Sequence, residues 1–224
     1  MGQYYHPVIL DPSGRVVATM YSHEYGEGLK LMEHSYLGNP FVEAFEILLA
    51  MDAACRVVWA GDYADDEPVA PELVRTPGTD LELREAHDEF EGLNLYGYAQ
   101  KAPHVRMNVP AYREQQPWHR DPKPEPNFEP PFLVTAESHP FILNHDDMLY
   151  VDKRSVPDVA WRDGLKIHPL PLLTCEGNGR GGGDYFAHDD VDHLIGSWAR
   201  KRISVGSSVT DDFTEIKFNL TEPS

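Results

Sequence analysis

The feature that most constrains the fold is a proline-rich stretch in the middle of the chain. Eight prolines lie between Lys101 and Pro131: Pro103, Pro110, Pro117, Pro122, Pro124, Pro126, Pro130 and Pro131. Proline lacks a backbone N–H and clashes with the preceding helical turn, so this stretch cannot sustain a helix or a central strand. We therefore expect residues 101–131 to form an extended arm or surface loop, serving as a linker, a lid or a partner-binding strap.

Before this arm, the sequence predicts a hairpin, a helix, a strand and a second helix. The expected elements are, in order, a hairpin of Tyr4–Leu10 and Arg15–Tyr21, a helix over 40–50, a strand over 56–60 and an acidic helix over 80–90. Turn-forming residues at 11–14 indicate the hairpin. Asn39 followed by Pro40 is typical of a helix start, and apolar residues then recur at helical spacing.

The second half is β-rich. Strands are expected over Phe132–Thr135, Pro140–Leu143, Met148–Val151, Leu170–Thr174, Ser197–Val205 and Phe213–Leu220. The sequence has no repeats, and strands do not alternate with helices as they do in a doubly wound sheet. It therefore predicts a single α+β domain over residues 1–224, with a mostly antiparallel sheet, one or two packed helices and the proline-rich arm.

Charge narrows the range of partners. The chain has 37 acidic and 19 basic residues, a net charge of −18. Nucleic-acid binding through phosphates needs a concentrated basic face, so it is disfavoured. The basic cluster Arg200-Lys201-Arg202 is either a small-anion contact or a solvated strand end that balances nearby acids. The negative field could instead attract a basic partner or mimic DNA.

Cysteine usage and the N-terminus bear on location. Cys55 and Cys175 are far apart and show no CxxC spacing, so neither a disulfide framework nor a zinc ribbon is implied. The N-terminus lacks a signal-peptide pattern, and no stretch is long and apolar enough to span a membrane. The expected location is the cytoplasm.

A glycine-rich run over 176–185 is the best candidate contact. Its five glycines can adopt positive φ and let backbone N–H groups converge on an anion. It fits neither the Walker pattern nor the dinucleotide fingerprint. The predicted ligand-binding residues are Glu176, Asn178, Arg180, Asp184 and Tyr185. The alternative is a flexible hairpin loop that binds nothing.

Two further groups of residues could carry chemistry. The metal candidates are His188, Asp189, Asp190 and His193, in a segment that could equally be an exposed acidic loop. The catalytic candidates are His23, His34, Asp62 and Asp184, which would suit acyl or phosphoryl transfer beside a serine. No Gly-x-Ser-x-Gly elbow accompanies them.

Several short motifs also carry a resemblance. They are Gly2-Gln3-Tyr4-Tyr5, Met20-Tyr21-Ser22-His23, residues 28–35, Trp59-Ala60-Gly61-Asp62-Tyr63, residues 176–185 and Gly196-Ser197-Trp198-Ala199-Arg200. Together they resemble an uncharacterised family of small proteins encoded by tailed phages of actinobacteria and by their hosts. The resemblance implies a phage or prophage setting and supplies no activity, cofactor or catalytic residue.

Three hypotheses follow. The first is a non-enzymatic phage or prophage accessory protein in the host cytoplasm that binds a host protein or a small anionic molecule through the glycine-rich loop and Arg180. The second is a metal-dependent hydrolase or transferase with His23 or His34 as general base. The third is a virion component.

Overall fold

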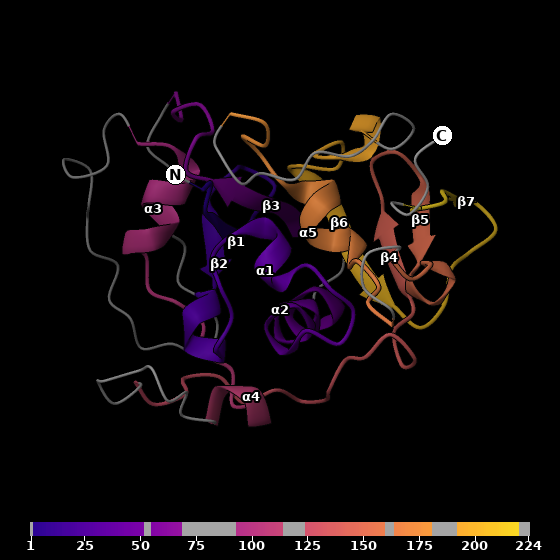
Figure 1. Cartoon of the computed structure of the whole chain (residues 1–224), viewed down its shortest axis with the longest axis horizontal. Helices are drawn as coiled ribbons and strands as arrows, with labels where there is room; N and C mark the ends of the chain where they lie inside the picture. The colour runs from indigo at the N-terminus through magenta and orange to yellow at the C-terminus, as the bar shows by residue number, and fades with distance from the viewer. Residues whose placement is uncertain are drawn as a thin grey trace.

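A computed structural model describes residues 2–51, 55–68, 93–113, 124–159, 164–180 and 192–219. They form an α+β fold around a seven-stranded sheet, in the order β2-β1-β3-β6-β4-β5-β7 (Figure 1). Every neighbouring pair is antiparallel except β5 and β7. The predicted fold class is therefore confirmed. The single domain remains a prediction.

The strands are short. Their bounds are β1 Tyr5–Leu10, β2 Val16–Thr19, β3 Cys55–Gly61, β4 Phe141–Asn144, β5 Leu149–Asp152, β6 Lys201–Gly206 and β7 Thr214–Glu215. The longest uninterrupted pairing joins β1 to β3, from Tyr5 opposite Gly61 to Leu10 opposite Arg56. The antiparallel pairing of β1 with β2 confirms the predicted first hairpin. The pairing of β1 with β3 confirms the strand predicted at 56–60, and it fixes where β3 ends.

One helix is long and the others are one or two turns. The α-helices are α1 Leu31–His34, α2 Pro40–Met51, α3 Leu95–Lys101, α4 Pro110–Arg113 and α5 Pro169–Thr174, and the 3₁₀ turns are η1 Ser22–Tyr25, η2 Lys153–Ser155 and η3 Asp192–Leu194. The Asn39 side chain accepts hydrogen bonds from the N–H groups of Phe41 and Val42, at 3.0 and 3.1 Å. The helix start predicted from Asn39-Pro40 is therefore confirmed.

Helices cover both faces at the β2-β1-β3 end of the sheet. One face of β1 and β3 contributes Tyr5 and Trp59 to the main core, which also holds Phe41 and Phe45 of α2 and Leu172 of α5. The opposite face carries a second core cluster, in which β1, β2 and β3 pack against α3 (Figure 1). Because successive side chains of a strand point to opposite faces of the sheet, neighbouring residues of β1 and β3 pack into different core clusters.

The described part of the proline-rich arm packs against the body of the protein. Val105, Met107 and Val109 are buried in the main core. The Val105 N–H donates to the carbonyl of Thr19 at 2.8 Å, and the Met107 N–H donates to the Tyr25 hydroxyl at 2.9 Å. The described part of the arm is mostly extended, with one helical turn that begins at Pro110, where the missing N–H of proline costs no helical hydrogen bond.

Two predicted strands are wrong. Leu170–Thr174 is helical, because Pro169 occupies the first helical turn and His168 caps it by accepting a hydrogen bond from the Leu170 N–H at 3.2 Å. Residues 132–135 form no strand, and Leu133 is exposed. The strands predicted at 197–205 and 213–220 are shorter than expected.

The acidic helix expected over 80–90 lies outside the described residues. No helix in the described part has the length and apolarity needed to cross a bilayer.

Candidate functional site

Two loops meet where β3 ends. The first follows Gly61 and runs to Pro68; the second follows α5 and runs from Glu176 to Arg180. Cys175 pairs with Trp59 of β3 in a parallel bridge, and the Glu176 N–H donates to the Trp59 carbonyl at 2.9 Å. The end of β3 thus holds the start of the glycine-rich run against the loop that contains Asp62.

Glycine allows this close approach. A Cβ on Gly61 would overlap the carbonyl oxygen of Glu176 and the amide of Gln3. Gly177 has φ +78°, and a Cβ there would lie 2.7 Å from the backbone nitrogen of Ala64. Gly61 and Gly177 are therefore required for the two backbones to touch.

A cavity of about 360 Å³ lies between the two loops. We call it the two-loop pocket. Its lining residues are Ala64, Asp65, Asp66, Glu67, Pro68, Glu176, Gly177, Arg180 and Arg200. Four acidic and two basic side chains line it, so its formal charge is −2. Glu176 and Arg180 were predicted from sequence as ligand contacts; a third predicted contact, Asn178, lies nearby, with its side-chain oxygen 3.5 Å from the Tyr5 hydroxyl.

Arg200 is fixed at the base of the pocket. Its guanidinium donates to both carboxylate oxygens of Glu176, at 2.5 and 3.0 Å, and also pairs with Glu67. These hydrogen bonds, with Glu176 first, raise the pKa of Arg200 above its usual range although partial burial opposes them. Arg200 also has a left-handed backbone, φ 61°, which is strained for a bulky residue. Two carboxylates are therefore committed to holding one cation.

Arg180 is held more loosely. Its guanidinium pairs with Asp65 at 2.5 Å, but the Arg180 and Asp65 side chains are 53% and 84% exposed. An ion pair this exposed contributes little to stability and can exchange partners. Asp66 is exposed and makes no ion pair with any described residue. Asp65 and Asp66 are thus the carboxylates accessible to a ligand.

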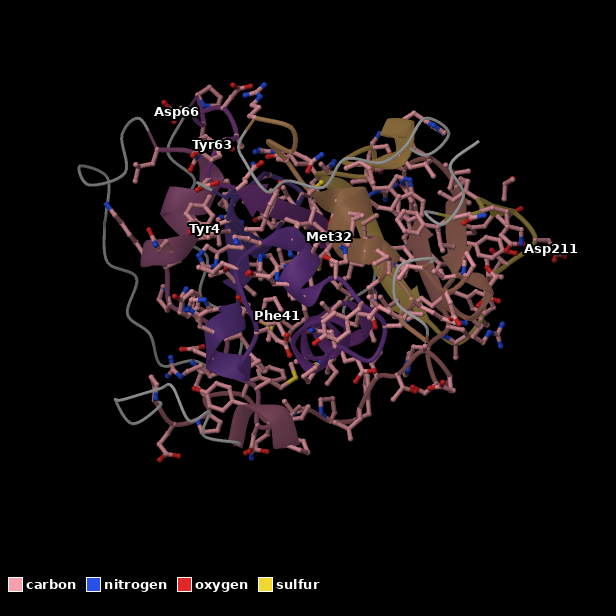
Figure 2. All side chains as sticks on the ribbon, viewed as in Figure 1. Tyr4, Met32, Phe41, Tyr63, Asp66 and Asp211 are labelled. Atoms are coloured by element: carbon pink, nitrogen blue, oxygen red, sulfur yellow. The ribbon has the colours of Figure 1, made fainter. Side chains whose placement is uncertain are left out.

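Two exposed tyrosines accompany these acids. Tyr4 is 38% exposed and Tyr63 is 37% exposed. The backbone N–H of Tyr4 donates to the Asp62 carboxylate at 3.0 Å, so Tyr4 is tied to the first loop. Figure 2 shows Tyr4, Tyr63 and Asp66 on the same side of the molecule, with Asp211 at the opposite end.

The two candidate histidines lie apart from this pocket. His34 is fully buried on the α2 side of the sheet, where its Nδ1 donates to the Gly28 carbonyl at 2.9 Å and its Nε2 accepts from the Trp59 indole at 2.8 Å. Burial lowers its pKa to about 4. Both ring nitrogens are therefore engaged in structural hydrogen bonds, and the ring is neutral at pH 7.

His23 belongs to a different group of rings. Its Nδ1 lies 3.0 Å from the Tyr21 hydroxyl, and the Tyr21 ring contacts both His23 and His6 at tilted angles, with centroids 5.0 and 5.4 Å away. The His6 ring contacts Tyr96 of α3, with centroids 4.7 Å apart. His23 is thus associated with the α3 side of the sheet. The structure does not bring His23, His34 and Asp62 into one catalytic arrangement.

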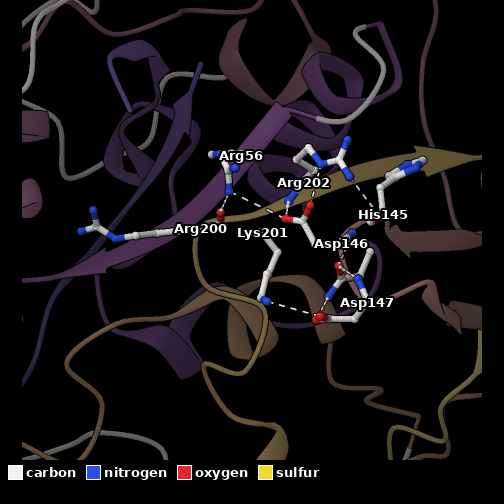
Figure 3. Close-up of polar contacts among 8 residues, drawn as sticks. Arg56, His145, Asp146, Asp147, Arg200, Lys201 and Arg202 are labelled. Atoms are coloured by element: carbon white, nitrogen blue, oxygen red, sulfur yellow. Dashed lines mark hydrogen bonds and ion pairs between the residues drawn. The ribbon is translucent and has the colours of Figure 1, made fainter. Parts of the chain in front are cut away.

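The basic cluster is paired with acids. Lys201 pairs with Asp147 at 3.3 Å and Arg202 with Asp146 at 2.6 Å, both in the turn between β4 and β5. Figure 3 shows the Arg200 side chain pointing away from these two. Its partners are Glu67 and Glu176 of the two-loop pocket. The cluster therefore matches the solvated strand end that balances acids.

The metal prediction falls largely outside the described residues. His188, Asp189 and Asp190 are not described, nor are Asp184 and Tyr185 of the glycine-rich run. His193 lies in η3 and is exposed. Within the described ranges, no three His, Cys, Asp or Glu residues are grouped so that they could hold a metal ion.

A buried ionic network was not predicted from sequence. Lys153 of η2 donates to both carboxylate oxygens of Glu46 in α2, at 2.8 and 2.6 Å, and all three side chains of the network are buried. The third, His168, lies 3.2 Å from Glu46 through Nε2. Because His168 Nδ1 accepts the Leu170 N–H, the proton sits on Nε2 and faces Glu46. A glutamate within the apolar stripe of α2, between Val42 and Leu49, is the sequence signal that could have revealed it.

Comparison with known proteins identifies no relative. No protein-family model matches the sequence, and neither a curated protein nor a solved structure matches the chain.

Proposed function

We propose that this chain is a phage or prophage accessory protein that binds a host protein, and that the two-loop pocket receives a basic side chain of that partner. The phage setting and the host cytoplasm depend on the resemblance of its motifs alone. The binding mode depends on the charges of the pocket. The observation that carries it is the exposed pair Asp65 and Asp66 beside Arg180 at the mouth of an acidic cavity.

The charges favour a cation over an anion at this position. Arg200 is neutralised by Glu67 and Glu176, and Arg180 already pairs with Asp65, so an incoming anion would have to displace a carboxylate from a pocket whose formal charge is −2. An arginine or lysine of a partner could instead bind Asp66 and compete with Arg180 for Asp65. The net charge of −18 would attract such a partner at long range.

The exposed tyrosines support a protein partner. Tyr4 and Tyr63 are large, partly exposed rings beside the acids. Aromatic side chains are enriched at protein interfaces, and a cation can bind over a tyrosine face. Neither ring lines the cavity, but Tyr63 lies in the same loop as Asp65 and Asp66, and Tyr4 is bonded to that loop through Asp62. An acidic cavity next to exposed aromatic side chains suits an arginine-containing segment better than a free metal ion or a nucleotide.

The test is a fluorescence-anisotropy titration with two labelled peptides of a Gly-Ser backbone, one with three arginines and one with three glutamates. Native protein should bind only the arginine peptide. The Asp65→Asn/Asp66→Asn variant should bind it about tenfold more weakly, because it loses two exposed ion pairs of about 0.7 kcal/mol each, a value within their usual range.

The matched control is Asp211→Asn/Asp212→Asn. It removes the same charge from two adjacent exposed aspartates at the other end of the molecule (Figure 2). Equal weakening by both variants would mean that the peptide follows net charge only and would contradict the assignment of the pocket.

A further inference from the structure

A second cavity, of about 380 Å³, shares no residue with the two-loop pocket. It lies beside the first turn of α2, the turn before β4, and η2. Its lining residues are Leu37, Gly38, Glu43, Ala136, Glu137, Lys153, Arg154, Gly164 and Lys166. Its volume is within the range of small-molecule sites.

The charge of this cavity is opposite to that of the whole chain. Three cations, Lys153, Arg154 and Lys166, line it with two carboxylates, Glu43 and Glu137. Its formal charge is therefore +1 with both carboxylates ionised, in a chain whose net charge is −18. Because Lys153 and Arg154 already pair with Glu46 and Asp152, which lie outside the lining, Lys166 is the cation that can attract a small anion to this position.

The three cations of this cavity differ in whether a carboxylate already binds them. Lys153 is buried and both of its hydrogen bonds go to Glu46. Arg154 uses Nε and Nη2 for Asp152, at 3.0 and 2.7 Å. Lys166 is partly exposed and makes no ion pair with any described residue. Lys166 is thus the cation available to a ligand. Arg154, which also lines the cavity, keeps one guanidinium nitrogen, Nη1, outside its hydrogen bonds to Asp152.

Glu43 supplies a proton-dependent group. It is half-buried, and burial, then Glu46, raises its pKa to about 7, while Lys153 lowers it and Glu137 raises it further. The charged groups around it come from α2, η2, the turn before β4 and the segment after Gly164; they are Glu46, Lys153, Arg154, Glu137 and Lys166. A protonated Glu43 donates a hydrogen bond and removes one negative charge from the cavity.

We propose that this cavity binds a small molecule through a phosphate or carboxylate group, with Lys166 and Arg154 as its contacts and Glu43 as a further group that lines the site. Buried Lys153 and Glu46 form the rigid floor that positions Arg154, the next residue in the chain. This site goes beyond the proposed function, because a small oxyanion and a basic protein segment bind at different places.

The test is isothermal titration calorimetry of the full chain at constant ionic strength, with sulfate standing for the phosphate class and acetate for the carboxylate class. Neither probe changes charge between pH 6 and pH 8. Saturable binding of one probe identifies the class. Saturable binding of neither at pH 6 overturns the proposal.

Three variants make the assignment specific. Lys166→Gln should weaken binding about tenfold or more, since one charged hydrogen bond is lost. Lys201→Gln is the same change in β6, where Lys201 pairs with Asp147 of the β4–β5 turn, and it should leave binding of the probe unchanged. Binding to the native protein should fall about tenfold from pH 6 to pH 8 as Glu43 loses its proton.

Glu43→Gln keeps a neutral donor, so its binding should be the same at both pH values. Equal effects of Lys166→Gln and Lys201→Gln, or an undiminished pH dependence in Glu43→Gln, would overturn the assignment of these residues.

Discussion

Replacing Lys153 with methionine should strongly destabilise the protein. The Lys153 ammonium lies 2.6 and 2.8 Å from the two oxygens of the fully buried Glu46 carboxylate. Among the described residues, the substitution leaves that carboxylate with His168 as its remaining polar partner. Breaking a buried ion pair from one side costs about 3–5 kcal/mol. For a chain of this size that corresponds to a melting temperature lower by roughly 10 °C.

The effect should depend on pH. Burial alone would raise the pKa of Glu46, but His168 and Lys153 outweigh it, and the native pKa is lowered. The native pair therefore contributes stability above the unfolded pKa of about 4.3 and loses it as the pH falls. In Lys153→Met, burial raises the Glu46 pKa above its unfolded value, so the variant gains stability relative to native protein from pH 7 to pH 5.

The assay is urea unfolding at pH 5, 6, 7 and 8, with the free energy of unfolding compared at each pH. Lys201→Met, which removes an exposed partner of Asp147, serves as control and should cost at most about 1 kcal/mol. The double variant Glu46→Leu/Lys153→Met should recover most of the stability, since no charge stays buried. A loss below about 1 kcal/mol in Lys153→Met, or one independent of pH, would refute the reasoning.

Three further predictions concern single residues. Gly177→Ala should lower the melting temperature more than Gly179→Ala. Both glycines have positive φ, but a Cβ at Gly177 would lie 2.7 Å from the neighbouring loop, whereas a Cβ at Gly179 would meet nothing within 4 Å. Equal melting temperatures would contradict this prediction. Asn39→Ala should cost about 1 kcal/mol by urea unfolding, because α2 loses its cap, and no loss would show that the cap is dispensable. Burial lowers the pKa of His34 to about 4 and that of His6 to about 3. Both rings stay neutral in the folded state and become charged in the unfolded state, so each should reduce the free energy of unfolding by about 1.4 kcal/mol per pH unit as the pH falls below 6.5. Replacing His34 with glutamine should make the free energy of unfolding less dependent on pH in this range.

Local signals predicted much of the fold. The first hairpin follows from its turn residues, and α2 follows from Asn39, Pro40 and the apolar spacing. The error at α5 has a physical cause: a six-residue apolar run does not distinguish a buried strand from a buried helix. Pro169 in the first helical turn and the capping side chain of His168 favour the helix here.

The sites were less predictable because they join distant residues. Glu176 and Arg180 could be predicted as contacts because they lie in the glycine-rich run. Asp65, the partner of Arg180, is 115 positions away in the chain. Glu46 and Lys153 are separated by 107 positions, and no local pattern links them. Such pairs depend on the register of β3 and on the packing of α2, which only the three-dimensional arrangement supplies.

The most direct test of the proposed binding mode is a ¹H–¹⁵N NMR titration of the full chain with the three-arginine peptide. Saturable chemical-shift changes should centre on the amides of residues 62–67 and 176–180, and the Asp65→Asn/Asp66→Asn variant should reduce them. Shifts that are spread over the acidic surface, or that centre on the turn near Asp211, would contradict the assignment of the two-loop pocket as the partner-binding site.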